Sequence, residues 1–110
     1  MDNCLFCQII NGQISAPFVF ENDQLIVIKD IHPKAPVHLL IIPKKHIPSI
    51  NYLTDDDRQI IGDMFLAAKQ LAETYQVAND GYRLIINTNS FAGQTVNHLH
   101  LHLLGGKKLS

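Results

Sequence analysis

The residues from His98 to Leu103 alternate strictly between histidine and leucine. Successive side chains of a β-strand point to opposite faces, so this pattern predicts a strand with leucines on one face and imidazoles on the other. Histidine is neither a strong strand former nor a favoured core residue. The row of three imidazoles, at His98, His100 and His102, therefore indicates a chemical role rather than a requirement of stability.

The remaining apolar positions predict a short helix and four more strands. Runs of apolar and β-branched residues separated by turn residues are typical of short strands. Residues 4–11 instead have the pattern of a short helix, which Gly12 ends. Strands are expected near residues 18–21, 24–29, 38–42 and 82–88, with turns at Asn22-Asp23 and Asn79-Asp80-Gly81 and a stop at Pro43.

One long amphipathic helix is expected in the middle of the chain. Thr54 followed by Asp57 resembles a capping box, and the acidic residues 55–57 suit the positive end of a helix. Apolar residues then recur at helical spacing, which predicts a helix of about 20 residues. We interpret this apolar stripe as core: Ile60, Ile61, Met64, Phe65, Ala68, Leu71, Ala72 and Tyr75. The elements predict an α+β fold, a five-stranded antiparallel sheet with one short N-terminal helix and one long helix on one face.

Size and charge narrow the class of protein. The chain has 110 residues, 46% of them hydrophobic, and a formal net charge of −1, which predicts a single domain over residues 1–110. This charge offers no basic surface for nucleic acid, and no apolar run approaches the roughly 20 residues of a membrane span. No apolar signal segment follows Met1-Asp2-Asn3, so a cytoplasmic location is expected. A domain of this size buries only about two-thirds of its unfolded surface, which favours a homodimer.

Three imidazoles in line could bind a metal or perform catalysis. At about 3.3 Å per residue, neighbouring histidines of the row stand about 6.6 Å apart and the outer pair about 13 Å apart. Two of them could share a metal ion, but three on a flat strand could not. The alternative is that His100 is a nucleophile whose neighbours orient it or move protons. A neutral imidazole attacks phosphorus readily, and water then hydrolyses the phosphoryl-imidazole.

The segment before the histidine row favours phosphate chemistry. Gly93 allows backbone N–H groups to approach an anion closely, while Gln94 and Thr95 add an amide and a hydroxyl. Asn87, in the preceding predicted strand, could donate a further hydrogen bond. Neither a Walker-type loop nor a GxGxxG sequence is present, so the common nucleotide-binding folds are not supported.

Taken together, these segments resemble the histidine triad (HIT) family, in particular its nucleotide-binding branch of purine nucleoside phosphoramidases. The resemblance extends from Leu5 to Gly106 and includes residues 30–36, 38–46 and 81–83 as well as the histidine row. It implies a HIT-like fold in which His100 takes up the nucleotidyl group and His102 contacts the α-phosphate. The phosphate would also be lined by Asn87, Gly93, Gln94 and Thr95.

The resemblance also implies a pocket for the nucleoside. Asp30 would hold the ribose, because an ionised carboxylate accepts hydrogen bonds from both hydroxyls, and Ile31 would flank the base. His38 is expected near the site, where it is interpreted as a core histidine or, alternatively, as a residue that acts on a substrate only through other residues. Three apolar residues, for each of which ordinary core packing is the alternative role, would wall the purine ring: Leu5, Phe6 and Ile9.

The activity implied by the resemblance is hydrolysis of the P–N bond of purine nucleoside 5′-monophosphoramidates. A nucleotidyl-histidine would form on His100, and water would then release the nucleoside monophosphate. Thr95, His102 or water would relay the proton to the leaving amine, and the chemistry itself requires no metal. The alternatives are hydrolysis of dinucleoside polyphosphates, a nucleotide-binding regulatory protein with incidental catalysis, and a hydrolytic zinc enzyme that uses His98 and His100 together.

Cys4 and Cys7 form a CxxC sequence whose spacing alone leaves its role open. A disulfide is typical of secreted chains, and a redox pair lacks its usual βαβ context here. Two free thiols, a redox pair or half of a zinc site remain as interpretations. Some members of the HIT family complete such a site with two histidines. The resemblance therefore implies a structural zinc site with the ligands Cys4, Cys7, His46 and His98.

The resemblance further implies how the homodimer would form. Strand 82–88 and the long helix would pack against a second copy around a two-fold axis, so that two five-stranded sheets become one ten-stranded sheet. Such pairing would bury an edge strand of each copy and make stability depend on protein concentration.

Overall fold

A five-stranded antiparallel sheet organises residues 3–110, the part of the chain that this computed structural model describes. Residues 1 and 2 of the expected domain lie outside the described residues. Neighbouring strands follow the order β1-β2-β3-β5-β4, and every pair is antiparallel. The predicted α+β class is confirmed. The strands are β1 (Phe20–Glu21), β2 (Leu25–Lys29), β3 (Val37–Pro43), β4 (Tyr82–Ile85) and β5 (Leu101–Gly105).

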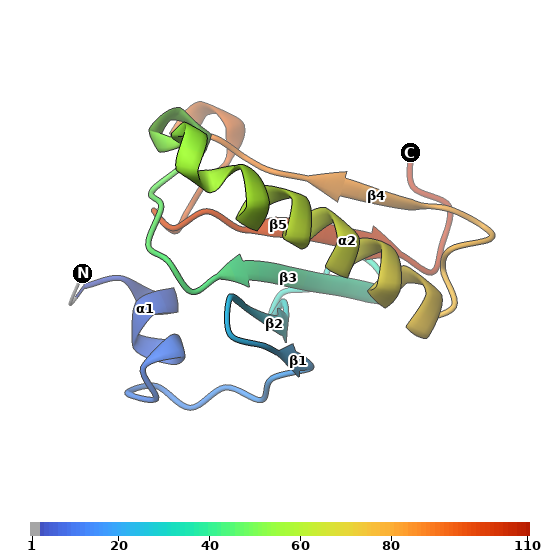
Figure 1. Cartoon of the computed structure of the whole chain (residues 1–110). Helices are drawn as coiled ribbons and strands as arrows, with labels where there is room; N and C mark the ends of the chain where they lie inside the picture. The colour runs from blue at the N-terminus through green and yellow to red at the C-terminus, as the bar shows by residue number, and fades with distance from the viewer. Residues whose placement is uncertain (1–2) are drawn as a thin grey trace.

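Two α-helices accompany the sheet (Figure 1). The long helix α2 (Arg58–Thr74) lies across one face of the sheet, and the short helix α1 (Leu5–Ile10) lies at one end of it. Both helices therefore occur where the sequence pattern predicts them. No described helix is both long and apolar enough to cross a membrane. Three short 3₁₀ helices occur in the connections: η1 (Ile50–Tyr52), η2 (Asp55–Asp57) and η3 (Ser90–Ala92).

Strand β3 lies in the middle of the sheet and is buried on both faces, because its residues are almost continuously apolar. Leu39 and Ile41 belong to the core cluster beneath α2. Leu40 and Ile42 belong to a second core cluster, on the other face, which also contains Phe6 of α1. The alternation of side chains along one strand thus separates two cores.

The start of the long helix contains the predicted capping box. The backbone N–H of Thr54 donates to Asp57 Oδ2 at 2.9 Å. The first turn is the 3₁₀ helix η2, so α2 itself begins at Arg58 and has 17 residues. The prediction that Phe65 belongs to the core is wrong: it is 43% exposed, because it follows the buried Met64 and points about 100° away from it. The buried positions are Ile60, Met64, Ala68, Leu71 and Ala72.

Strands β1, β4 and β5 are shorter than the sequence pattern predicts, and β1 has only the residues Phe20–Glu21. Strand β4 ends at Ile85, and β5 begins only at Leu101, so His98 and His100 precede the strand. The backbone N–H of His98 donates to the carbonyl of Val96 at 2.8 Å, which makes a tight turn in place of a sheet ladder. The facial separation of leucine from histidine is nevertheless confirmed. All three leucines of the row lie in the core cluster beneath α2: Leu99, Leu101 and Leu103.

Candidate functional site

His98 is fully buried, and its two ring nitrogens have different partners. Nε2 lies 2.7 Å from the carbonyl oxygen of Pro43, to which it donates its N–H. The neutral ring therefore has its lone pair on Nδ1. This atom lies 3.3 Å from Cys4 Sγ, 3.5 Å from Cys7 Sγ and 3.1 Å from His46 Nδ1. The carbonyl of Pro43 thus fixes the tautomer that can bind a metal.

Helix α1 brings the two thiols to this point. Cys4 is the N-cap of α1, and its sulfur accepts the backbone N–H of Cys7 at 3.3 Å. Residues three apart lie on the same side of a helical turn, so both sulfurs can face one point. Cys7 Sγ also lies 3.3 Å from His46 Nδ1. The four residues form a cluster that could hold a metal ion: Cys4, Cys7, His46 and His98.

The dimensions of this cluster fit a tetrahedral ion. Metal–nitrogen bonds of about 2.0–2.1 Å and metal–sulfur bonds of about 2.3 Å give tetrahedral edges of about 3.3 Å between nitrogens and about 3.5 Å between nitrogen and sulfur. The nitrogen–nitrogen separation is 3.1 Å, and the nitrogen–sulfur separations are 3.3 Å and 3.5 Å. The partner of His98 here is His46, not another member of the histidine row. Two thiols with two imidazoles are a ligand set typical of structural zinc.

Burial controls protonation in the cluster. It raises the pKa of Cys7 to about 11, with a further contribution from the neighbouring Cys4. It also lowers the pKa of His98 to about 4 and lowers the pKa of His46. Without a metal, the Cys7 thiol is therefore protonated and both imidazoles are neutral near pH 7. A metal would have to displace the proton of Cys7, while the imidazoles are ready to bind.

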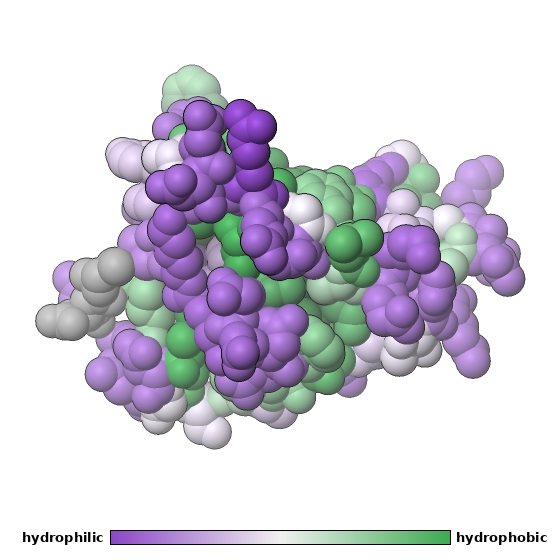
Figure 2. Space-filling view, in the orientation of Figure 1, coloured by the Kyte–Doolittle hydropathy of each residue, from purple (hydrophilic) through white to green (hydrophobic). Residues whose placement is uncertain are grey.

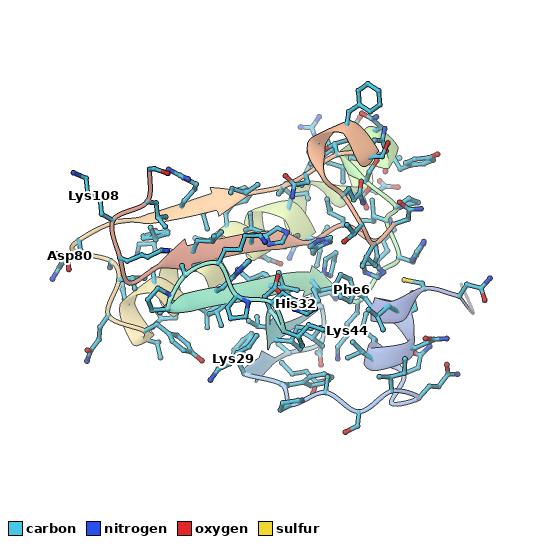
Figure 3. The ribbon with its side chains drawn as sticks, turned by 180° about the vertical axis from the view of Figure 1, so that it is seen from behind. Phe6, Lys29, His32, Lys44, Asp80 and Lys108 are labelled. Carbon is cyan, nitrogen blue, oxygen red and sulfur yellow. The ribbon has the colours of Figure 1, made fainter. Side chains whose placement is uncertain are left out.

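His100 is held through its other nitrogen. Its Nδ1–H donates to the backbone carbonyl of His98 at 2.7 Å, and the residue is 7% exposed. In the neutral ring the lone pair is then on Nε2, which is the form that a nucleophile needs. Burial lowers the pKa of His100, and the hydrogen bond to His98 opposes this shift. The ring of Phe6, which Figure 3 shows between α1 and the sheet, packs edge-on against both imidazoles.

A chain of hydrogen bonds fixes the tautomer of His102. The backbone N–H of Lys34 donates to His38 Nδ1 at 3.1 Å, so a neutral His38 carries its proton on Nε2. This nitrogen lies 3.0 Å from His102 Nδ1 and 3.4 Å from Asp30 Oδ2. With Nδ1 as the acceptor, His102 presents an N–H at Nε2. Burial, followed by the nearby His100 and His38, lowers the pKa of His102 to about 4 and keeps the ring neutral.

The direct contact between His38 and His102 was not predicted, because it depends on strand register. In the pairing of β3 with β5, Leu40 stands opposite His102 and His38 stands opposite Leu104. The two histidines are therefore diagonal neighbours on one face, within reach of long side chains. The ring centroids of His100 and His102 are 4.9 Å apart. The two rings are therefore neighbours on this face, although His100 lies before the regular strand.

Gln94 shapes the expected phosphate loop from the inside. It is 8% exposed, and its Oε1 accepts the backbone N–H of Asn89 at 2.7 Å. Its Nε2 donates to the carbonyls of Pro48 and Val96 at 2.8 Å and 3.0 Å. Asn89 and Gly93 both have positive φ, 67° and 95°, so the chain turns sharply on either side of η3. Both N–H groups of the Gln94 amide are thus used within the protein, and the backbone N–H groups of Gly93 and Gln94 donate to the carbonyls of Ser90 and Asn89.

The residues predicted to hold the nucleoside differ in exposure. Leu5 is 42% exposed and Ile31 is 85% exposed, whereas Phe6 and Ile9 are only 4% and 6% exposed. A base could therefore contact Leu5 and Ile31 more readily than the other two residues. One carboxylate oxygen of Asp30 accepts the backbone N–H two residues ahead at 2.8 Å. Of the residues predicted to contact the phosphate, Gly93 and Thr95 are exposed and Asn87 is half-buried.

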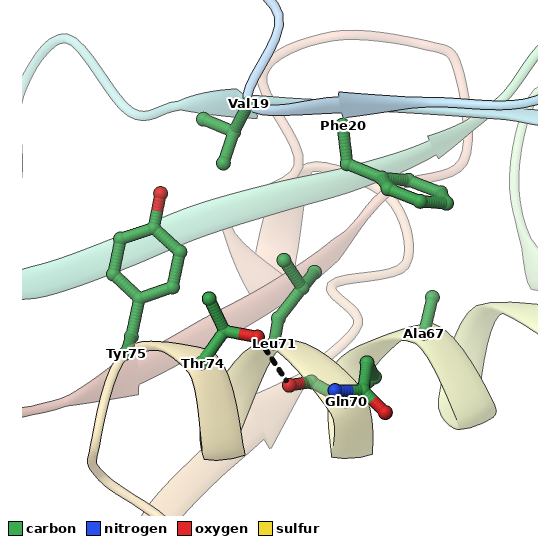
Figure 4. A pocket seen from close by; sticks show the side chains of 7 residues that line it. All are labelled: Val19, Phe20, Ala67, Gln70, Leu71, Thr74 and Tyr75. Atoms are coloured by element: carbon green, nitrogen blue, oxygen red, sulfur yellow. Dashed lines mark hydrogen bonds between the residues drawn. The ribbon is translucent and has the colours of Figure 1, made fainter.

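The described residues enclose one small cavity beside the imidazoles and a larger one away from them. A cavity of about 140 Å³ is bordered by Asp30 and His38. A larger cavity of about 370 Å³ lies between β1 and α2 (Figure 4). It has no part in the imidazole site, because no histidine, cysteine or carboxylate is among its lining residues, Val19, Phe20, Ala67, Gln70, Leu71, Thr74 and Tyr75.

Comparison with known proteins identifies the family. A family model described as "Scavenger mRNA decapping enzyme C-term binding" matches residues 3–109. The chain belongs to the histidine triad (HIT) family, which confirms the resemblance found in the sequence. The purine nucleoside phosphoramidase of Escherichia coli (strain K12) is 43% identical over 108 residues, covering 98% of this chain and 91% of that protein.

Solved structures agree over almost the whole chain. A HIT family hydrolase from Legionella pneumophila Philadelphia 1 is 50% identical, with a TM-score of 0.96, and the match covers 98% of this chain and 96% of that one. A histidine triad protein from Clostridium difficile is 39% identical, with a TM-score of 0.94, and the match covers 100% of this chain and 95% of that one. These structures share the fold described above.

Proposed function

We propose that this member of the HIT family is a hydrolase that cleaves the P–N bond of purine nucleoside 5′-monophosphoramidates. The observation that carries the proposal is the tautomer of His100, whose Nδ1–H is held by the carbonyl of His98 and whose lone pair is on Nε2. His102 stands beside it with its own tautomer determined by His38. The name of the E. coli relative, purine nucleoside phosphoramidase, supports this substrate class.

The reaction would proceed in two displacements at phosphorus. Nε2 of His100 attacks the α-phosphorus, and the P–N bond to the amine breaks as the bond from phosphorus to Nε2 forms. The amine leaves with a proton. Water then attacks the phosphorus of the nucleotidyl-histidine, breaks the bond to Nε2 and releases the nucleoside monophosphate.

His102 is better suited to stabilise the negative charge on the phosphate oxygens than to transfer a proton to the leaving amine. Because its pKa is lowered to about 4, the ring is neutral near pH 7 and its Nε2–H donates a hydrogen bond to a phosphate oxygen. The backbone N–H of Thr95 and the side-chain amide of Asn87 would add donors, since the N–H groups of Gly93 and Gln94 already donate within the loop. The hydroxyl of Thr95 or a water would then relay the proton to the leaving amine, and the water that attacks in the second displacement would return a proton to this relay.

The nucleoside would lie beside the imidazoles on the same face of the sheet. Asp30 would accept hydrogen bonds from the ribose hydroxyls, and the exposed Ile31 and Leu5 would contact the base. Phe6 and Ile9 would contribute only the small part of their surface that is exposed. The phosphate would lie against Asn87, the backbone of Gly93 and Gln94, Thr95, His100 and His102.

We infer that the cluster of Cys4, Cys7, His46 and His98 holds structural zinc. Zinc there would link α1 to the loops that carry the two histidines and would take no part in the displacement steps. Thiol ligands persist in a reducing compartment, which supports the cytoplasm as the location. Metal analysis of protein purified without chelator should find about one zinc per chain. Protein kept reduced and found without zinc would reject this inference.

The homodimer with a ten-stranded sheet is also our proposal. Strand β4 forms one edge of the sheet, where its outer backbone groups are free to pair with a second copy. On α2, Leu66 is 66% exposed and Phe65 is 43% exposed, and apart from the adjacent residues and the backbone of the helix itself no atom lies within 4 Å of where a Cβ on Gly62 would be. The face in Figure 2, which has α2 in front, accordingly shows hydrophobic side chains among the hydrophilic ones. These features suit a close-packed partner helix.

The experiment that tests the proposed activity compares three substrates side by side: adenosine 5′-phosphoramidate, a dinucleoside polyphosphate and adenosine diphosphate. The phosphoramidate should be hydrolysed fastest, and His100→Asn, which is similar in shape, should lower turnover by about 10³-fold or more. His32→Asn, at an exposed histidine, is the matched control and should retain turnover.

The alternatives give different results in the same assay. Faster cleavage of the dinucleoside polyphosphate would indicate the other hydrolase activity of this family. Tight binding of adenosine monophosphate with negligible turnover of all three substrates would indicate a regulatory protein. Near-normal turnover by folded His100→Asn would reject the nucleophile.

A further inference from the structure

Phe6 lies between the two cysteines in the sequence and against two imidazoles in space. We propose that Phe6 is a positioning residue that couples the metal cluster to His100, so that a bound metal holds this imidazole in its reactive orientation. The inference rests on the proposed role of His100 as the nucleophile. The metal cluster consists of Cys4, Cys7, His46 and His98.

The ring of Phe6 contacts both His98, a member of the metal cluster, and His100, the proposed nucleophile. It packs edge-on against His98, with ring centroids 5.9 Å apart and an interplanar angle of 80°. It packs in the same way against His100, with centroids 5.1 Å apart and the same angle. Edge-on pairs of aromatic rings have a preferred geometry, so a shift of one ring favours a shift of the others. A single side chain thus touches both a member of the metal cluster and the proposed nucleophile.

The position of Phe6 depends on the metal cluster because α1 has only six residues. Cys4 is its N-cap and Cys7 lies one turn later, so the two thiols flank Phe6. A tetrahedral metal would tie both ends of this turn to His98 and His46 with bonds of fixed length. Phe6 would then be held at a fixed distance from His98, and through its ring also from His100.

A second route connects the same two histidines. The carbonyl of His98 accepts the Nδ1–H of His100 at 2.7 Å, which fixes one atom of the ring. Within the tolerance of this hydrogen bond, the imidazole can still turn about its Cα–Cβ and Cβ–Cγ bonds. The edge of Phe6, which is itself 4% exposed and closely packed, limits this rotation. The two contacts together determine where Nε2 of His100 lies.

Core packing is the alternative explanation for Phe6, since it belongs to a buried cluster with Ile26 and Ile42. A core role predicts that any comparable loss of packing in this cluster has the same effect. The coupling role predicts an effect specific to the aromatic ring. Ile26→Val therefore serves as the control, because Ile26 is fully buried in the same cluster and has no part in the proposed site.

Imidazole nitrogen NMR measures the coupling without any turnover. Addition of Zn²⁺ to metal-free protein should shift and sharpen the Nδ1–H signal of His100 in the parent and in Ile26→Val. Phe6→Leu should lose most of this response while still binding Co²⁺, which reports thiolate ligation by its visible absorption. Phe6→Tyr, which keeps the ring, should restore the response. If Phe6→Leu does not fold, Phe6→Met takes its place, because its unbranched and flexible side chain adapts better to the space of the missing ring.

Kinetics then separate positioning from contact with the base. Phe6→Leu should slow formation of the nucleotidyl-histidine about tenfold, since small misplacement of a reacting group is costly. Its affinity for adenosine monophosphate should stay within about twofold of the parent's, an energy difference below about 0.5 kcal/mol. A residue that walls the base would show the opposite division, with weak binding and normal chemistry.

The outcomes distinguish this inference from the proposed function. An equal zinc response of His100 in Phe6→Leu, or no response in the parent, would overturn the coupling. A parent that shows the zinc response but forms no nucleotidyl-histidine would overturn the proposed activity and leave the mechanical link between Phe6 and His100 in place.

Discussion

Backbone carbonyls give two histidines of the row opposite tautomers. The carbonyl of Pro43 accepts the Nε2–H of His98, and the carbonyl of His98 accepts the Nδ1–H of His100. The lone pair of His98 is therefore on Nδ1, which faces the thiols, and that of His100 is on Nε2. At the scale of single residues, neighbouring imidazoles of the same kind are thus prepared for two different kinds of chemistry.

The buried amide of Gln94 offers a prediction at the same scale. Gln94→Ala should lower the free energy of unfolding by about 2–3 kcal/mol, because it leaves an N–H and two carbonyls of the loop without their partner. Gln70→Ala, at an exposed position of α2, should change it by no more than about 0.5 kcal/mol. Urea unfolding of both variants is the measurement. Equal stability of the two would show that Gln94 does not support the loop.

The alternation of histidine and leucine was enough to predict that the three imidazoles share one face, because in an extended chain alternate side chains point the same way. The contact between His38 and His102 could not be predicted in this way, because it depends on the register of β3 against β5. Nor could the hydrogen bond from Gln94 to Pro48, since the two residues meet only when a long loop closes. The metal ligands were implied by family resemblance, because their spacing along the chain does not bring them together by itself.

At the scale of elements, local signals predicted where helices begin better than where strands end. The capping box at Thr54 is a local hydrogen-bond pattern and is confirmed. Strands β4 and β5 are shorter than predicted, because the loop around η3 takes up residues whose composition also suits a strand. The exposed Phe65 fitted the apolar stripe of α2 by type, but the width of the buried stripe depends on what packs against it.

The start of the long helix predicts a dependence of stability on pH. The hydrogen bond from Lys45, 2.6 Å from Asp57, and the one from the backbone of Thr54 lower the pKa of Asp57 below its ordinary value of 3.8. A carboxyl with a lowered pKa stabilises the fold above the ordinary value, and this stabilisation is lost as pH falls through the folded-state pKa. Asp57→Asn should therefore be less stable than the parent near pH 7, and the difference should shrink on acidification.

Thermal unfolding between neutral and strongly acidic pH checks this prediction. Asp56→Asn is the control, since it removes the same charge from an exposed neighbouring position. It should remain close to the parent across the range. A constant difference between Asp57→Asn and the parent down to acidic pH would contradict the assigned role.

At the scale of the whole molecule, the proposed dimer makes stability depend on protein concentration. Light scattering of the parent at micromolar concentration should give twice the mass of the chain. Leu66→Glu should weaken the dimer by about tenfold or more, about 1.4 kcal/mol, because it places a charge on an exposed apolar position of α2. Gln13→Glu, at an exposed polar position in the loop after α1, adds the same charge outside α2 and should leave the mass unchanged. A monomer mass for the parent would reject the proposed assembly.

The proposed reaction requires a covalent bond between His100 and the nucleotide, and this bond can be trapped. Parent protein mixed with adenosine 5′-phosphoramidate and quenched within one turnover should gain the mass of one adenylyl group. Peptide mapping should place this group on His100, and His100→Asn should gain none. Turnover at the normal rate without any adduct, or an adduct on a residue other than His100, would contradict the account.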